Sequence, residues 1–186
     1  MTVAVSPLTL RKRHDFTAAE FMSLESDDRT ELLQGTIYDV SPRNEPHRYA
    51  TGRLATTLAR GLGPEYIVRA ADAVAIAGRH GRDAPEVDVA VLPDAYYAEA
   101  PTAADVIALI EVSDTSYRLD RDYKIPLYVR AGVPSWIVNV SERRVEFYGA
   151  IADLDAPNGV VFTESDSVVV AGVRINVSDL FVKPAR

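Results

Sequence analysis

Three charged residues of this 186-residue chain, Asp88, Glu111 and Lys124, stand where their side chains could act together in hydrolysis. Glu111 ends the apolar run 106–110, and Asp88 interrupts a second, valine-rich run at 87–92. A carboxylate in so apolar a strand is costly to bury unless a cation or hydrogen-bond donors meet it. Two carboxylates and a lysine brought together at strand ends could bind a divalent metal ion and activate water.

Each of these residues also has a simpler structural explanation. Asp88 could cap a strand end or face solvent on an edge strand, and Glu111 could belong to a buried ion pair without a chemical role. Asp120 and Lys124 are four residues apart, a spacing that stabilises exposed helices by a few tenths of a kcal/mol. The residues alone leave both interpretations open.

Apolar patterns predict the elements that must position these residues. The runs 87–92 and 106–113 are rich in valine and isoleucine and bounded by polar residues, which is typical of strands buried on both faces. Apolar residues recur every four positions over 47–62, which predicts an amphipathic helix. His47 would then simply begin that helix.

Two further elements carry candidate residues. The alternating segment 31–40 surrounds a Gln-Gly turn and predicts a β-hairpin, in which Glu31 could be polar surface. Residues 120–131 have a helical pattern, but Pro126 lies inside it. Because proline removes a hydrogen bond beyond the first helical turn, the helix either starts near Asp122 or bends at Pro126.

The whole chain predicts one α/β (α+β) domain with a mixed sheet and about three helices. Residues 1–14 are expected to form a flexible arm, and 15–186 a single domain. A capping box at 17–20 predicts a short first helix. The remaining expected strands cover 66–69, 73–77, 134–140, 144–148, 159–162, 168–170 and 173–177, and a last helical turn covers 178–181.

Composition narrows the class of protein. The chain has no cysteine, which excludes disulfides, thiolate catalysis and cysteine zinc sites and fits a reducing cytoplasm. No apolar run is long enough for a membrane span or a signal peptide, so neither is expected. The net charge of -7 argues mildly against nonspecific nucleic-acid binding, which needs a local basic surface. The candidate arginines for such a surface are Arg48, Arg53, Arg79 and Arg82.

An ordered set of motifs resembles the Uma-two family of bacterial restriction endonucleases, which belongs to the PD-(D/E)xK nuclease superfamily. The resemblance spans roughly residues 17–150 and is strongest from Glu111 to Val138. Two departures stand out: Ser113 occupies the usual lysine position two residues after the glutamate, and Val87 precedes Asp88 where a proline is expected. The motifs are Glu31, Pro42 to His47, Pro85-Glu86-Val87-Asp88, Ile110-Glu111-Val112-Ser113, and Asp120-xxx-Lys124-xxx-Tyr128-xxx-Gly132-Val133-Pro134-x-Trp136-Ile137-Val138.

The resemblance implies a restriction-endonuclease-like fold, a central mixed β-sheet flanked by helices, with the site at one edge. It implies Mg²⁺ or Mn²⁺ as cofactor, DNA as substrate and a homodimer. Asp88 and Glu111 would be metal ligands, and Lys124 the catalytic lysine moved to the following helix. Glu31 would be an additional acidic ligand or orienter, and His47 and Asp120 match accessory positions.

Two other functions stay open at this stage. The chain could be a catalytically inactive nucleic-acid-binding or scaffold domain that keeps the nuclease fold and binds DNA through its arginines. It could instead be a metal-dependent hydrolase of a small phosphorylated substrate, which an acidic surface tolerates better than long DNA.

Overall fold

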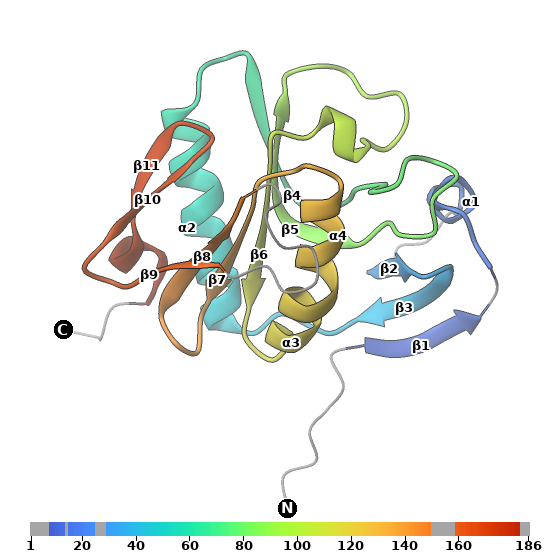
Figure 1. Cartoon of the computed structure of the whole chain (residues 1–186), viewed down its shortest axis with the longest axis horizontal. Coiled ribbons are helices and arrows are strands. Elements are labelled where there is room, and N and C mark those ends of the chain that lie inside the picture. Colours follow the sequence, from blue (N-terminus) through green and yellow to red (C-terminus); the bar gives the residue numbers. More distant parts are fainter. Residues whose placement is uncertain (1–7, 14, 25–28, 150–158, 183–186) are drawn as a thin grey trace, which may run out of the picture.

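The computed structural model describes residues 8–13, 15–24, 29–149 and 159–182. Its centre is a six-stranded mixed sheet of order β4-β5-β6-β7-β8-β9 (Figure 1), in which β6 and β7 are parallel and the other neighbours antiparallel. The expected central mixed sheet is thereby confirmed. Its strands are β4 (Tyr66–Ala73), β5 (Glu86–Pro93), β6 (Ala108–Ser113), β7 (Ser135–Asn139), β8 (Arg144–Tyr148) and β9 (Val160–Phe162).

Helical segments cover both faces of this sheet, as Figure 1 shows. One face packs against α2 (Glu45–Gly61), the hairpin of β10 (Ser167–Val170) and β11 (Val173–Asn176), and the turn η3 (Val177–Leu180). The other face packs against α4 (Ile125–Arg130) and the short turn η1 (Ala103–Asp105). Within the described residues, no helix is long and apolar enough to cross a membrane.

Side chains of the neighbouring strands β5 and β6 alternate between these layers. Val89 and Ile110 pack with the α2 layer, whereas Ala90 and Leu109 pack with the α4 layer, and all four are buried. This is the two-sided burial that the apolar runs predicted, because successive strand residues point to opposite faces. Packing on both faces therefore fixes β5 and β6, and with them the residues at their ends.

A smaller sheet of order β1-β3-β2 lies beside the central one. The predicted hairpin is confirmed as β2 (Thr30–Leu33) and β3 (Thr36–Val40), with positive φ at Gln34 and Gly35 in its turn. The predicted capping box is also confirmed at Thr17 and Glu20, before α1 (Ala18–Met22). A backbone bridge between Leu32 and Ala84 joins the hairpin to the segment that leads into β5.

The expected flexible arm differs in part. Leu8–Arg13 forms strand β1, which pairs antiparallel with β3 and so satisfies the backbone groups on the edge that β2 leaves open. Residues 1–7 and 14 lie outside the described residues.

Two predicted boundaries also change. The expected strand at 73–77 is wrong: β4 runs unbroken from Tyr66 to Ala73, and beyond it only Ala75 forms an isolated bridge. Helix α2 begins at Glu45, earlier than expected, because the side chain of Asn44 accepts the N–H of His47 at 3.0 Å and so caps the first turn.

The helix around Pro126 follows neither expected alternative. It begins at Tyr117 as α3 (Tyr117–Leu119), widens into a π-helical turn, η2 (Asp120–Lys124), and continues as α4. Because Pro126 has no N–H for the carbonyl four residues earlier, a regular α-helical turn would be broken here. The wider turn absorbs this mismatch, and such turns are frequent at functional sites.

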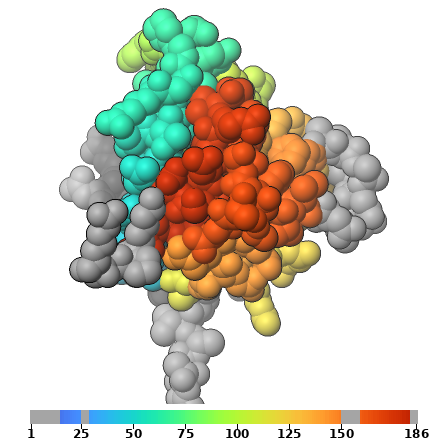
Figure 2. Space-filling view, turned by 90° about the vertical axis from the view of Figure 1, so that its left-hand side faces the viewer, coloured from blue at the N-terminus to red at the C-terminus, as the bar shows by residue number. Residues whose placement is uncertain are grey.

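The end of α2 fits closely against the hairpin β10–β11, which Figure 2 shows in red beside turquoise α2. A Cβ atom on Gly61 would lie 2.6 Å from Cγ1 of Val173, too close for van der Waals contact. Gly61→Ala should therefore lower the melting temperature, although alanine favours a helix by about 1 kcal/mol over glycine. In a Val173→Ala background the same change should be neutral or stabilising. Thermal unfolding of the four proteins checks this, and equal stabilisation in both backgrounds would contradict it.

Candidate active site

Asp88 and Glu111 lie at neighbouring positions of β5 and β6. The antiparallel pairing ends at Val89 and Ile110, so the next position outward places Asp88 opposite Glu111. There the backbone N–H of Val112 donates to Oδ2 of Asp88 at 2.9 Å, in place of a ladder carbonyl. Both carboxylates are buried, and β5 is an interior strand, so Asp88 caps a backbone group without facing solvent. Two carboxylates thus lie side by side where two core strands separate.

Lys124 reaches the same place from the π-helical turn. Its ammonium lies 2.9 Å from Oε2 of Glu31 and 3.6 Å from Oε1 of Glu111, and it donates to the carbonyl of Glu86 at 3.1 Å. The Lys124 side chain is only 7% exposed and that of Asp120, 3.8 Å away, only 3%. The interpretation of this pair as an exposed helix pair is therefore wrong: the amine points into the protein.

Glu31 and Asp120 complete the acidic surroundings of the lysine. Glu31 comes from β2 of the smaller sheet and also accepts the backbone N–H of Glu86 at 3.3 Å. Asp120 accepts hydrogen bonds from the hydroxyls of Ser113 and Ser116 at 2.7 and 2.6 Å. Ser113, which stands at the usual lysine position of the motif, thus holds an acid of the next helix.

Two side chains hold Asp88. His47, in the first turn of α2, places Nε2 3.1 Å from Oδ2, and the guanidinium of Arg43 contacts Oδ1 through Nη2 at 2.7 Å and Nε at 3.1 Å. Burial by itself raises the pKa of Asp88. The hydrogen bond and charge of His47, the charge of Arg43 and the N–H of Val112 outweigh burial and lower this pKa to about 2. Asp88 is therefore an anion throughout the neutral range.

The pKa of Glu111 moves the opposite way. Burial raises it well above its ordinary value; the charge of Lys124 and a 2.5 Å hydrogen bond from the Tyr128 hydroxyl oppose the rise, while Asp120 and Asp88 add to it. Burial lowers the pKa of Lys124, but the carboxylates of Glu111, Glu31 and Asp120 outweigh that effect and raise it well above its ordinary value. Lys124 is consequently a fixed cation beside a carboxyl group that resists ionisation.

Several residues of this network received no role in the sequence analysis. Arg43 also contacts Glu86 at 2.7 Å, and Arg29 binds the same carboxylate. Glu86 precedes Asp88 by two residues, so the period of a strand could have placed the two acids on one face. Tyr128 follows Lys124 by four, the spacing of one helix face. Arg43 lies in a loop, where no periodicity carries a signal.

One pocket of about 80 Å³ gathers the predicted residues, enough space for several water molecules. All six predicted catalytic and accessory residues line it, together with the newly found arginines. Its lining includes the ionisable residues Arg29, Glu31, Arg43, His47, Glu86, Asp88, Glu111, Asp114, Asp120 and Lys124.

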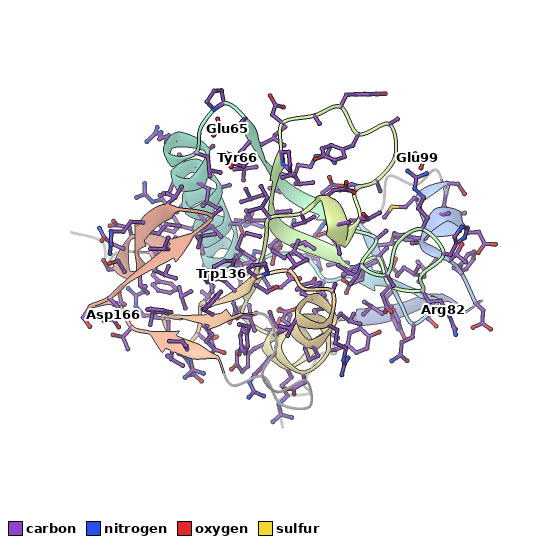
Figure 3. All side chains as sticks on the ribbon, turned by 45° about the horizontal axis from the view of Figure 1, so that its top comes forward. Glu65, Tyr66, Arg82, Glu99, Trp136 and Asp166 are labelled. Carbon is purple, nitrogen blue, oxygen red and sulfur yellow. The ribbon has the colours of Figure 1, made fainter. Side chains whose placement is uncertain are left out.

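The four arginines proposed for nucleic-acid binding do not lie together. Arg48 and Arg53 belong to α2, whereas Arg79 and Arg82 belong to the loop before β5. Figure 3 shows Arg82 beside the smaller sheet. Each has a partner within the chain: respectively the carboxylate of Glu45, the carbonyl of Asp179, and the carboxylates of Glu99 and Asp15.

The donor set suits a hard divalent cation bound by two carboxylates. Among the described residues, no three histidine, aspartate or glutamate side chains stand ready to hold a metal together, and Glu31 is bound to Lys124. Mg²⁺, however, commonly uses only one or two protein carboxylates and fills its other positions with water and phosphate. Asp88 and Glu111 would supply these two, which fits Mg²⁺ or Mn²⁺ better than softer metals.

Comparison with known proteins agrees with this fold. A crystal structure of a "putative nuclease belonging to DUF820" from Anabaena variabilis ATCC 29413 has a TM-score of 0.70 at 16% sequence identity, over 89% of this chain and 97% of that one. At this identity the likeness shows the fold alone. A search of curated proteins found no match. The family model Uma2 (Uma-two), described as "Putative restriction endonuclease", matches residues 16–177, and the chain therefore belongs to that family.

Proposed function

We propose that this chain is a metal-dependent endonuclease that hydrolyses phosphodiester bonds in DNA. The observation that supports it most is the convergence of Asp88, Glu111 and Lys124, from two core strands and a distorted helical turn, in one pocket. Membership in a family described as restriction endonucleases supports the same reaction class.

Asp88 and Glu111 would hold the cation because their strands fix both carboxylates at one edge of the sheet. When bound, Mg²⁺ or Mn²⁺ supplies a Lewis acid for the phosphate and lowers the pKa of water. His47 keeps Asp88 oriented from the side of α2. The ionised state of Asp88 means that one ligand needs no deprotonation before binding.

Lys124 would stabilise the negative charge that develops on the phosphoryl oxygens. Its raised pKa keeps it protonated, which favours this electrostatic role over that of a general base. Glu31 and the carbonyl of Glu86 fix the ammonium, so we assign Glu31 to orienting the lysine and not to direct ligation. Asp120, itself held by two serine hydroxyls, adds to the field around the amine.

The two other functions make different demands on these residues. An inactive DNA-binding or scaffold domain needs no such cluster, since buried like charges destabilise a fold that gains nothing from them. A small phosphorylated substrate would need a closed pocket with groups that recognise the rest of the molecule. The cavity of about 80 Å³ is too small for that, whereas it suits one phosphate of a long strand.

Isosteric changes test the chemistry directly. Asp88→Asn and Glu111→Gln should each reduce metal-dependent cleavage of DNA by at least about a hundredfold, because each removes a charged ligand. Glu65→Gln, an exposed acid at the far end of the sheet that Figure 3 labels, should cleave like the wild type. Gel assays with Mg²⁺, Mn²⁺ or EDTA provide the measurement. Wild-type rates in either pocket variant would refute the assignment.

The same assay on three substrates separates the candidate functions. DNA should be cut only with metal; RNA and a generic small phosphodiester should react more slowly under the same conditions. Binding of DNA without any cleavage, unaffected by EDTA, would favour the inactive domain. Hydrolysis of the small ester alone would favour the small-substrate hydrolase.

The raised pKa of Glu111 makes a prediction for stability. A carboxyl whose folded-state pKa lies above its ordinary 4.5 contributes stability below that pH and loses it as the pH rises. Glu111→Gln imitates the neutral form, and Lys124 keeps Glu31 and Asp120 as partners. Without metal, the variant should melt about 2–4 °C higher at neutral pH, the effect of ~1 kcal/mol in a chain of this size.

The difference should disappear below pH 4.5, where both proteins carry a neutral group at this position. Scanning calorimetry in EDTA across the acid and neutral range gives both values. A variant that is less stable than the wild type at neutral pH would show that ionised Glu111 stabilises the fold.

The homodimer that the family resemblance implies remains a prediction, and exposed valines suggest where to test it. Val160 and Val161, on the last strand of the described six-stranded sheet, are 56% and 51% exposed. Strand β9 could therefore pair with that of a second copy. Val161→Lys should convert a dimer to a monomer in light scattering, whereas Val169→Lys, a similarly exposed valine in β10, should not. A dimer that survives Val161→Lys would contradict this interface.

A further inference from the structure

Arg43 occupies the position at Asp88 that a metal ion would need. Its Nη2 lies 2.7 Å from Oδ1 of Asp88 and 2.7 Å from Oε1 of Glu86, so that one nitrogen bridges the two acids. The other oxygen of Asp88, Oδ2, already accepts hydrogen bonds from Val112 and His47. Any cation that binds Asp88 must therefore meet Arg43 at Oδ1.

Arg43 can leave this position without stranding its partners. Arg29 also binds Glu86, through Nε at 3.3 Å and through Nη2, so Glu86 would keep a cation. Asp88 would keep the bonds from His47 and Val112. Both acids therefore remain satisfied if the guanidinium of Arg43 moves away.

The place of Arg43 in the chain also permits such a movement. The residue belongs to the loop between β3 and α2, outside any helix or strand, and its side chain is 18% exposed. Lys124, by contrast, is 7% exposed and is held by Glu31 and a backbone carbonyl. Of these two cations in the pocket, Arg43 is the one that a metal ion could displace.

We propose that Arg43 is an internal counter-ion of the metal-free site, which occupies Oδ1 of Asp88 and competes with the divalent cation for it. The inference rests on the proposed function, since it concerns the same carboxylate pair. Arg43 is thus a residue that sets metal affinity. Its guanidinium neutralises Asp88 and Glu86 while no metal is bound, and it moves away from Asp88 when the ion binds. Its planar fork would then be free, beside the pocket, to donate hydrogen bonds to a phosphate oxygen.

The test is Mn²⁺ affinity of the full chain, measured by titration calorimetry at one fixed near-neutral pH. Arg43→Gln should bind Mn²⁺ about 10-fold more tightly than the wild type, the factor expected when one charge-assisted hydrogen bond no longer competes. Arg174→Gln is the matched control, because Arg174 lies in β11, donates to the hydroxyl of Ser167 and does not line the pocket; its affinity should stay within about twofold of the wild type. If Arg43 only holds its loop in place, Arg43→Gln should bind Mn²⁺ more weakly than the wild type, because the loop would lose its ion pairs with Glu86 and Asp88.

Thermal unfolding gives an independent measure that needs no activity. Saturating Mn²⁺ should raise the melting temperature of Arg43→Gln more than that of the wild type, because tighter binding to the folded state stabilises it more. Should Arg43→Gln fail to fold, Arg43→Lys keeps the charge but loses the fork. It should then bind Mn²⁺ a few-fold more tightly than the wild type.

Equal or weaker Mn²⁺ affinity in folded Arg43→Gln or Arg43→Lys overturns the inference for Arg43. If the wild type binds Mn²⁺ and cleaves DNA in that case, the proposed function stands. If neither the wild type nor any variant binds Mn²⁺ at millimolar concentration, the proposed metal site fails as well. Circular dichroism of each variant shows whether the fold is intact.

Discussion

A buried ammonium surrounded by carboxylates is the constraint on which the rest of this structure depends. Lys124 contacts Glu31 from the smaller sheet, the backbone of Glu86 from β5 and Glu111 from β6. One amine therefore joins both sheets and the distorted helix at a single point. Removing one partner of a buried ion pair leaves an unpaired charge, which is far more destabilising than loss of a surface pair. The position of the smaller sheet thus depends on the same interaction that organises the pocket.

The pocket concentrates negative charge that a protein selected for stability alone would disperse. Five of its carboxylates, those of Glu31, Glu86, Asp88, Glu111 and Asp120, are buried. Burial raises the pKa of Glu111 most, and the charges of Asp120 and Asp88 add to the rise. The cations in the pocket offset part of this charge. Such a balance is typical of sites where local stability is given up for function. A divalent cation would complete the compensation that the protein's own groups begin.

The sequence predicted the strands that carry this site better than it predicted the contacts between the side chains. Apolar runs were enough to place Asp88 and Glu111 on buried strands, because two-sided burial leaves a plain compositional signal. Their adjacency depends on the register of β5 and β6, which local patterns do not determine. The role of Lys124 came from the family resemblance, since its spacing from Asp120 suited an exposed helix equally well. Arg43 gave no signal, because a loop has no periodicity and its partners lie 43 and 45 residues away.

Local rules fail most clearly at η2, and the failure is informative. Asp120 and Lys124 are the first and last residues of a π-helical turn, and both of their side chains are buried. Pro126 lies two residues after the turn. A sequence chosen for a regular helix would avoid that proline and expose those charges. A likeness at 16% identity shows only the fold, and one fold supports many activities. The departure from helical rules at η2 is therefore stronger evidence for a function than the sheet around it. The π-helical turn places the side chains of Asp120 and Lys124 in the pocket beside the buried strands.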